Sequence, residues 1–192
     1  MDRRRVWRLV IAAAVVMLMP VWWGVLPPGT LDPNGAGKLT TKRKADGRDI
    51  AFSLATPTNR STTGSIRLVS ASLISPHGMT LVGAYSASVD DRAVFFAAGP
   101  VPPQAGDSND DQAMFNAWNA TIPLDQTVLA PGQQVILLLI IHLAAPDDCV
   151  WMDGFNLQYV QYGRVYSVPD PDLLLRVYSG DDISVCDLLD PD

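Results

Sequence analysis

The sequence predicts an all-β domain, a β-sandwich of about seven to eight strands, preceded by one N-terminal transmembrane helix. Three observations support this fold class. The chain has 20 aspartates and no glutamate, and aspartate prefers caps and turns whereas glutamate favours helix interiors. It contains 15 prolines and 14 glycines, which punctuate loops. Beyond the N-terminal segment, short apolar runs alternate with turn signals, and no helical period of comparable quality is present.

The N-terminal segment has the composition of a membrane anchor. Four arginines precede an uncharged run from Leu9 to Leu26, and at 1.5 Å per residue this run covers about 27 Å of the ~30 Å hydrocarbon core. Trp22 and Trp23 near its end are typical of an interfacial belt. The proline-rich end is a poor cleavage site, so a retained anchor is favoured over a cleaved signal peptide.

These features divide the chain into four parts. Residues 1–8 are expected to form a short cytoplasmic tail and residues 9–28 the transmembrane signal anchor. Residues 29–47 are expected to be a basic, flexible linker, and residues 48–192 an extracytoplasmic β-sandwich domain. Basic residues flank the anchor on both sides, but the N-terminal arginines adjoin it directly, so the N-terminus is placed in the cytoplasm.

Candidate strands follow the linker at short intervals. The apolar run Val135–Ala144 is too short to span a bilayer and suits a central strand buried on both faces. Phe155–Tyr159 alternates apolar residues with amides, and Tyr162-Gly163 predicts a hairpin turn after it. A polar loop is expected at Ala98–Asp111 and a short segment near Phe115–Ile122. The candidate strands are Asp49–Ala55, Ser65–Ile74, Met79–Val89, Arg92–Ala97, Val135–Ala144, Phe155–Tyr159, Arg164–Val168 and Leu173–Tyr178.

Charge is distributed unevenly and excludes one class of partner. Residues 60–192 carry five arginines against sixteen aspartates, a net charge of −11. Nucleic-acid binding requires the opposite sign, so nucleic acid is not an expected partner. The basic stretch Lys38–Lys44 is either a solvated tether or a contact with anionic lipid headgroups.

The two cysteines, Cys149 and Cys186, flank the last hairpin and strand. In an oxidising compartment they would form a disulfide, which stabilises a loop of this length by about 4 kcal/mol in the chain-entropy model. Separate or redox-active thiols are the alternative. The spacing fits neither a C-x-x-C motif nor a zinc site.

Metal sites have only weak candidates. His77 and Met79 form a His-x-Met pair that could bind Cu(I), although a turn histidine before a strand-start methionine explains the pair as well. Asp107, Asn109 and Asp111 place oxygen ligands at alternate positions, as a calcium loop does, but without the glycine and distal glutamate of an EF-hand. Asp147, Asp148 and Asp153 are a second such group. No metal site, cofactor or resident cofactor-binding residue is therefore predicted.

Catalysis is not predicted either. A Ser–His–Asp arrangement needs a histidine beside an activated serine, and the chain has only His77 and His142. No G-x-S-x-G motif is present, and the paired aspartates lie at turn positions. The expected class is a protein that is not an enzyme.

The order of these segments resembles a known group of proteins. The stretch from Ile74 to Ala84, the turn Leu129–Gly132 before a long apolar strand, and Cys149 before Phe155–Arg164 resemble small, uncharacterised actinobacterial single-pass membrane proteins. The resemblance implies an N-terminal anchor and an immunoglobulin-like extracytoplasmic domain. It carries over no catalytic or binding residue.

Two functions follow as hypotheses. The first is a non-catalytic, membrane-anchored envelope protein that uses its sandwich for protein–protein contact, as an accessory or assembly subunit of a membrane complex. Candidate contacts are exposed strand edges and the aromatic residues Trp118, Trp151, Tyr162 and Tyr166, each of which could equally serve core or hairpin packing. The second is an extracytoplasmic protein that binds copper, calcium or a small ligand.

Overall fold

The computed structural model describes residues 29–35, 37–42, 49–89, 99–101, 109–144, 149–178 and 186. By contact clustering the chain separates into two units, Met1–Thr30 and Leu31–Asp192. The second unit contains all the described strands, and the account below concerns it alone.

The described elements are strands with two short helices. The strands are β1 (Leu31–Asp32), β2 (Gly37–Lys42), β3 (Asp49–Ala55), β4 (Thr58–Asn59), β5 (Ile66–Leu73), β6 (Met79–Ala87), β7 (Gly99–Pro100), β8 (Ile122–Pro123), β9 (Val128–Leu129), β10 (Ile136–Leu143), β11 (Cys149–Met152), β12 (Phe155–Gln161), β13 (Arg164–Asp170) and β14 (Leu173–Tyr178). The helices are α2 (Asn109–Asn119) and the 3₁₀ turn η2 (Leu124–Gln126).

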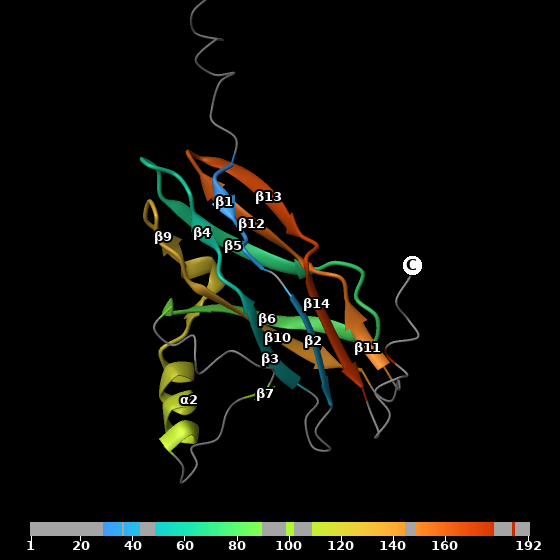
Figure 1. Ribbon diagram of the computed structural model, residues 1–192. Coiled ribbons are helices and arrows are strands. Elements are labelled where there is room, and N and C mark those ends of the chain that lie inside the picture. Colours follow the sequence, from blue (N-terminus) through green and yellow to red (C-terminus); the bar gives the residue numbers. More distant parts are fainter. Residues whose placement is uncertain are drawn as a thin grey trace, which may run out of the picture. The chain divides into compact units, whose positions relative to one another are not determined.

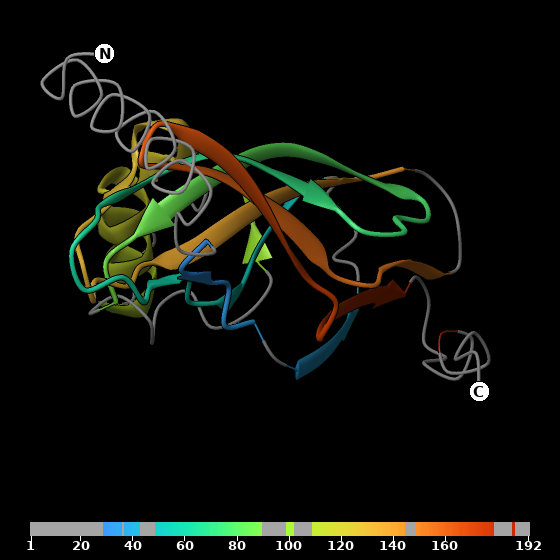
Figure 2. The same ribbon diagram turned by 90° about the horizontal axis from the view of Figure 1, so that it is seen from above.

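The strands form two packed layers, which Figures 1 and 2 show from the side and from above. The first sheet has the order β7-β3-β10-β6-β8, and the second has the order β13-β12-β5-β9. In an immunoglobulin-type sandwich, strands B, E and D share one sheet and strands C, F and G the other. Taken in chain order, strands B to G correspond to β3, β5, β6, β10, β12 and β13. The equivalents of B, E and D are then β3, β10 and β6 in the first sheet, and those of C, F and G are β5, β12 and β13 in the second. The prediction of an all-β sandwich is confirmed, and its strand order is immunoglobulin-like.

The last four long strands form one bent ribbon. β12 pairs with β13 through a two-residue turn at Tyr162 and Gly163, whose φ values of 51° and 73° are both positive, as a type I′ turn requires. The predicted hairpin is therefore confirmed. β11 and β14 continue the ribbon beyond a bend at Gly154, where φ is 121° and a side chain would collide with the backbone of Asp170. Beyond this bend β14 also pairs with β2, in parallel.

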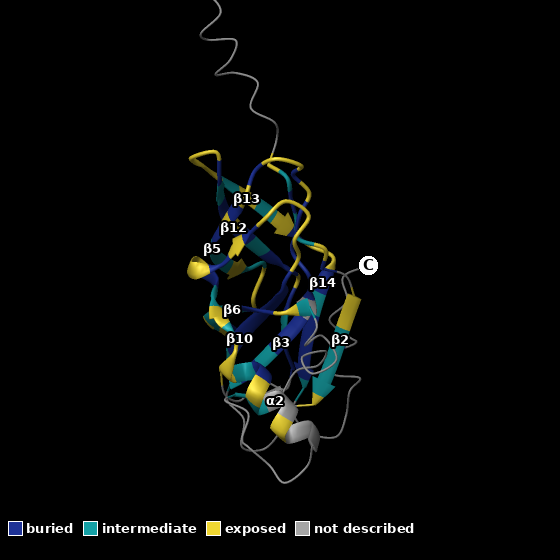
Figure 3. Ribbon diagram, turned by 90° about the vertical axis from the view of Figure 1, so that its left-hand side faces the viewer, coloured by how far each residue is buried: buried dark blue, intermediate teal, exposed yellow. Residues whose placement is uncertain are grey.

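The core lies between the sheets, and β10 is its centre. Leu137, Leu139, Ile141 and Leu143 face the second sheet and are at most 1 % exposed. Figure 3 shows buried residues concentrated in β10 and β14. Because the opposite side of β10 is also covered, the strand is apolar on both faces, as its uninterrupted sequence predicts.

Helix α2 supplies part of that second cover. Ile136 and Leu138 on the outer face of β10 form a separate buried cluster with Ala87 of β6 and Ala117 of the helix, and Trp118 packs against it. In Figures 1 and 2 the helix lies at one end of the sandwich. The sequence predicted a loop up to Asp111 and a short segment near Phe115–Ile122, but not a helix over Asn109–Asn119. Among the helix side chains that the structure describes, Ala117 and Trp118 in the last turn pack against the sheet.

The linker prediction requires correction. Residues 29–47 were expected to be a flexible linker, yet β1 and β2 lie within this range and β2 pairs with β14 over six residues. Their polar sequence is compatible with an edge strand, because the partner strand supplies backbone hydrogen bonds without requiring apolar side chains. Arg92–Ala97 and the anchor at residues 9–28 lie outside the described residues. Of the helices that the structure describes, none has the length and apolar character to cross a membrane.

Candidate functional site: a groove between two sheet edges

The candidate site lies between β5 of the second sheet and β6 of the first sheet, where the two sheets separate. Each of these strands is paired along its inner side, β5 with β12 and β6 with β10. On the outer side β9 pairs only with Ile66 and Arg67, and β8 only with Tyr85 and Ser86. Among the described residues, no strand pairs with the outer edges of Val69–Leu73 and Met79–Ala84. Two uncovered sheet edges therefore flank the same opening.

Both edges carry a β-bulge at the opening. The β5–β12 register shifts between Leu68 and Ser70, so Val69 is the extra residue. The β6–β10 register shifts between Leu81 and Gly83, so Val82 is the extra residue. A bulge twists its strand and changes the direction of its side chain. Val82 is 58 % exposed. Leu81 and Ala84, on either side of it in β6, pack against the main core.

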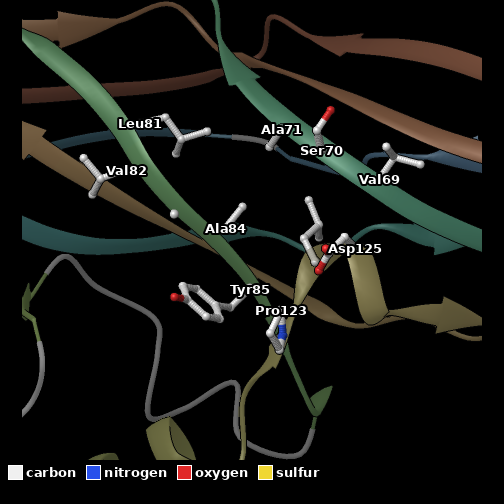
Figure 4. A pocket seen from close by; sticks show the side chains of 11 residues that line it. Val69, Ser70, Ala71, Leu81, Val82, Ala84, Tyr85, Pro123 and Asp125 are labelled. Carbon is white, nitrogen blue, oxygen red and sulfur yellow. The ribbon is translucent and has the colours of Figure 1, made fainter.

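The opening is a groove with a volume of about 400 Å³, lined from both edges. Figure 4 shows Leu81, Ala71 and Ala84 in the gap between the two strands, with Asp125 at one end. These three apolar side chains also pack against the main core, so the groove is a place where the interior of the sandwich reaches the surface. The remaining lining residues are Val69, Ser70, Val82, Gly83, Tyr85, Pro123 and Leu124.

One end of the groove is closed by the segment between β8 and β9. Leu124 is buried between the sheets at 3 % exposure. Thr127 connects both edges: its hydroxyl lies 2.6 Å from that of Ser86 on β6, and its carbonyl accepts a 3.0 Å hydrogen bond from the amide of Leu68 on β5. Buried hydrogen bonds through Thr127 therefore join the two strands at this end of the groove.

The described lining of the groove is mostly apolar. Among its described residues Asp125 is the only charged one, and the hydroxyls of Ser70 and Tyr85 are the other polar side-chain groups. This described lining contains no histidine, no cysteine and no second carboxylate. Apolar walls with a few polar groups and free backbone edges are suited to an extended chain.

The structure separates the predicted copper ligands. His77 is exposed, exchanges two backbone hydrogen bonds with Trp151, and stacks on its ring at a centroid distance of 3.9 Å. Met79 is buried in the main core at 4 % exposure. His142 lies on the outer face of β10, where its Nδ1 atom is 2.6 Å from Oδ1 of Asp49. Each side chain thus has its own packing or polar partner.

The predicted calcium ligands are only partly described. The backbones of Asn109 and Asp111 lie in α2, and their side chains, like Asp107, Asp147 and Asp148, are outside the described part. Across the residues whose side chains the structure does describe, no three metal-ligating groups come together. Binding of copper or calcium stays the alternative hypothesis, and the described residues do not test it.

The four aromatic candidates all have intramolecular contacts. Trp118 packs at 5.9 Å from Tyr85, and Trp151 stacks on His77. Tyr166 stacks on buried Tyr159 at 5.3 Å. The hydroxyl of Tyr162 lies within hydrogen-bond distance of the hydroxyls of Ser61 and Thr63, and these bonds lower the pKa of its phenol. All four therefore contribute to packing or to the hairpin, which is the role that the sequence offered as the alternative to contact with a partner.

The predicted disulfide is confirmed. Cys149 and Cys186 are bonded across a separation of 37 residues, and both are buried. Arg176, itself 5 % exposed, donates a 2.8 Å hydrogen bond to the backbone carbonyl of Cys186. The alternative of two separate thiols does not hold in this structure, in which neither cysteine is free.

Sequence reasoning did not find the groove. Its residues come from β5, β6 and η2, and neither edge is marked by a motif. One signal was available: the edges Val69–Leu73 and Met79–Ala84 contain no charge and no proline, the two devices that usually protect an exposed edge. That signal becomes usable only when the strand order shows which strands are at an edge.

Comparisons with known proteins add little to this description. No family model matches the chain, and no curated protein matches it. Among solved structures, the VesB protease of Vibrio cholerae superposes with a TM-score of 0.38 and 11 % identity, over 78 % of this chain and 32 % of the protease. The chain thus spans about a third of that protein's length.

The second structural likeness has similar strength. The ASH or PapD-like domain 7 of human CEP192 superposes with a TM-score of 0.35 and 11 % identity, over 82 % of this chain and 94 % of that domain. Neither likeness carries an argument about this chain, and the assignment of its fold rests on its own strand order. The resemblance to actinobacterial membrane proteins stays a prediction.

Proposed function

We propose that this chain is a non-catalytic, membrane-anchored envelope protein that binds an extended segment of a partner protein in the groove between β5 and β6. In this role it is an accessory or assembly subunit of a membrane complex. The observation that carries the proposal is the pair of uncharged, bulged sheet edges on either side of an apolar groove of about 400 Å³. A partner strand beside such an edge gains backbone hydrogen bonds, and the groove receives its side chains.

The bulges determine what kind of segment fits. Val69 and Val82 interrupt the two edges, so neither edge can accept a long, regular strand. The bound segment is therefore short and extended, held mainly by small apolar side chains in the groove. A basic residue in it would meet Asp125 at the closed end, and the net charge of −11 on residues 60–192 disfavours an acidic partner.

The location outside the cytoplasm is supported by two features. The disulfide between Cys149 and Cys186 is of a kind that persists in oxidising compartments. The N-terminal segment has the length and charge flanks of a signal anchor. Together they favour a domain held at the outer surface of the membrane, where it meets other envelope proteins.

Affinity purification from native membranes tests the proposal. The tagged full chain is solubilised in mild detergent, and co-purified proteins are quantified by mass spectrometry for the wild type and for Val82→Asp. We expect the variant to lose its main partner by roughly tenfold or more, because a carboxylate on the groove wall would be desolvated by the bound segment. A photo-crosslinking residue at position 82 should label an extended segment of the same partner.

The matched control is Val165→Asp, which places the same charge on another exposed valine, on β13 and away from the groove. It should recover the partner as well as the wild type does. Equal recovery with the wild type and Val82→Asp, in a preparation that keeps known complexes intact, would overturn the proposal.

A further inference from the structure

The first described part of the domain is an N-terminal strap, which consists of β1, residues 33–35 and β2. β1 pairs with β4 through two residue pairs, and β2 pairs with β14, as Figure 1 shows. Between the two strands the chain carries Asn34 followed by Gly35. Asparagine before glycine is especially prone to deamidation, because glycine has no side chain to shield its backbone nitrogen. The strap therefore contains a chemically labile pair.

The fold requires both members of this pair. Asn34 has a φ of 45°, in the left-handed region that asparagine adopts more readily than most residues. Gly35 is buried against the carboxyl group of Asp170, and a side chain at this position would collide with that group. The labile pair is thus part of the way the strap is built.

Hydrogen bonds hold the pair on every side. The backbone carbonyl of Asn34 accepts a 3.3 Å bond from the amide of Thr56, and its side-chain amide donates to the Thr56 hydroxyl at 2.8 Å. The amide of Gly35 donates to Oδ2 of Asp170 at 2.7 Å. The amide of Asn34 donates to Oδ1 of Asp32 at 3.1 Å. Backbone and side chain of Asn34 are both fixed by these contacts.

This arrangement separates the two groups that have to react. Deamidation requires the nitrogen of Gly35 to reach Cγ of Asn34. In a trans peptide group the C=O and N–H bonds point in opposite directions. The peptide between the two residues turns its carbonyl towards Thr56 and its N–H towards Asp170, and the side chain of Asn34 is bonded on the Thr56 side. The closed strap therefore protects Asn34 from attack.

We propose that Asn34 is a self-modification site, which deamidates when the strap opens and is protected while it is closed. In the open strap the nitrogen of Gly35 forms a bond to Cγ of Asn34, and the bond between Cγ and Nδ2 breaks. The nitrogen of Gly35 gives its proton to solvent water, and Nδ2 takes a proton from water and leaves as ammonia. A further water molecule then opens the cyclic imide to aspartate or isoaspartate. No oxidant, reductant or enzyme is needed.

The modification prevents the strap from closing again. Isoaspartate carries the backbone through its side chain, so the chain between β1 and β2 gains a methylene group. The Thr56 hydroxyl loses its amide donor, and the new carboxylate adds negative charge beside Asp32 and Asp170. The modified residue consequently marks molecules whose strap has opened. This inference concerns the strap alone and does not depend on what the groove binds.

Peptide mapping of the full-length protein, purified in mild detergent, tests the proposal. Mass spectrometry after incubation measures asparagine, aspartate and isoaspartate at position 34, in the folded protein and in the same chain kept unfolded in denaturant. When opening and closing are fast, the rate of modification follows the population of the open form. We expect the folded protein to react more slowly by roughly tenfold or more. Equal rates would overturn the proposal.

Two variants release the strap without altering the labile pair. Asp170→Ala removes the acceptor of the Gly35 amide, and Thr56→Val removes the hydroxyl that holds the Asn34 side chain. Each should raise the rate at Asn34 in the folded protein by roughly tenfold. The matched control is Asp49→Ala, which removes a carboxylate contact with His142 at the opposite end of β3 from Thr56 and should leave the rate unchanged.

Circular dichroism establishes which variants are folded. Folded variants that react no faster than the wild type would overturn the proposal, and the comparison of folded and unfolded wild type stands if a variant does not fold. Trypsin supplies a second readout, because β2 contains Lys38 and Lys42. The isolated isoaspartate form should be cut within β2 faster than the unmodified protein. If it resists trypsin equally well, the modification does not release the strap and the inference fails.

Discussion

Asp170 is a buried carboxyl group that connects the start of the domain to its last hairpin. It is 3 % exposed, and its two oxygens accept hydrogen bonds from the amides of Gly35 at 2.7 Å and Asp172 at 3.2 Å. Gly35 permits this close approach, because a side chain there would collide with the carboxyl group. The contact lies at the end of β13, where the second sheet bends.

The ionisation of Asp170 should make the domain less stable as pH rises. Burial raises the pKa of Asp170, although the amide hydrogen bonds oppose the shift. The folded protein thus binds this proton more tightly than the unfolded chain, whose carboxyl pKa is about 3.9. The stabilising contribution is full below that value and is lost as pH rises through the folded-state pKa.

Thermal unfolding of the wild type and Asp170→Asn measures this effect. The unfolding temperature of the wild type relative to the variant should fall as pH increases from about 4. Taking the difference between the two proteins removes the contribution of the other aspartates. A difference that instead grows with pH would show that the folded-state pKa of Asp170 is lowered.

Residue-scale contacts of this kind could not be predicted from sequence. Asn59 is fully buried, and its amide donates to the carbonyls of Gly64 at 2.8 Å and Leu129 at 3.0 Å while accepting from Ser61 at 2.9 Å. In the sequence it is one polar residue in a loop-like stretch. Its partner at Leu129 is 70 residues away, and only the folded chain brings the two together.

At the scale of elements, the disulfide joins β11 to the segment after β14. Cys186 is fully buried, and Arg176 on β14 donates a hydrogen bond to its carbonyl. β11 pairs with β14 through Trp151 and Arg176, so the bond and the strand pairing hold together the same three-stranded sheet, β11-β14-β2. Loss of the disulfide should therefore loosen that sheet.

We expect the double variant Cys149→Ser, Cys186→Ser to lose about 4 kcal/mol of unfolding free energy by the chain-entropy estimate. In a domain of this size this corresponds to a fall of roughly 10 °C in unfolding temperature. Near-UV circular dichroism during heating measures it. The wild type under reducing conditions should behave like the variant, and an unchanged unfolding temperature would refute the structural role of the bond.

Element prediction succeeded where the signal was local. β3 and β14 have the predicted bounds, and β5, β6, β10, β12 and β13 differ from prediction by one or two residues at one or both ends. Their apolar or alternating patterns predict these strands correctly, because the faces that the patterns mark as apolar are the faces that tertiary packing buries. β2 was missed because its polar sequence has no such pattern, and α2 because its polar sequence, Asn109–Asn119, has only a weak apolar stripe. The groove was missed because strand order is not encoded in any single segment.

The parallel pairing of β2 with β14 has a mechanical consequence. β2 is the first long strand of the domain and β14 the last, and they pair side by side from Gly37 and Leu173 to Lys42 and Tyr178. Because the two strands run in the same direction, the chain enters at one end of the pair and leaves at the other. Tension between the two ends of the domain would load the six residue pairs in shear, all at once, rather than peel them apart in succession.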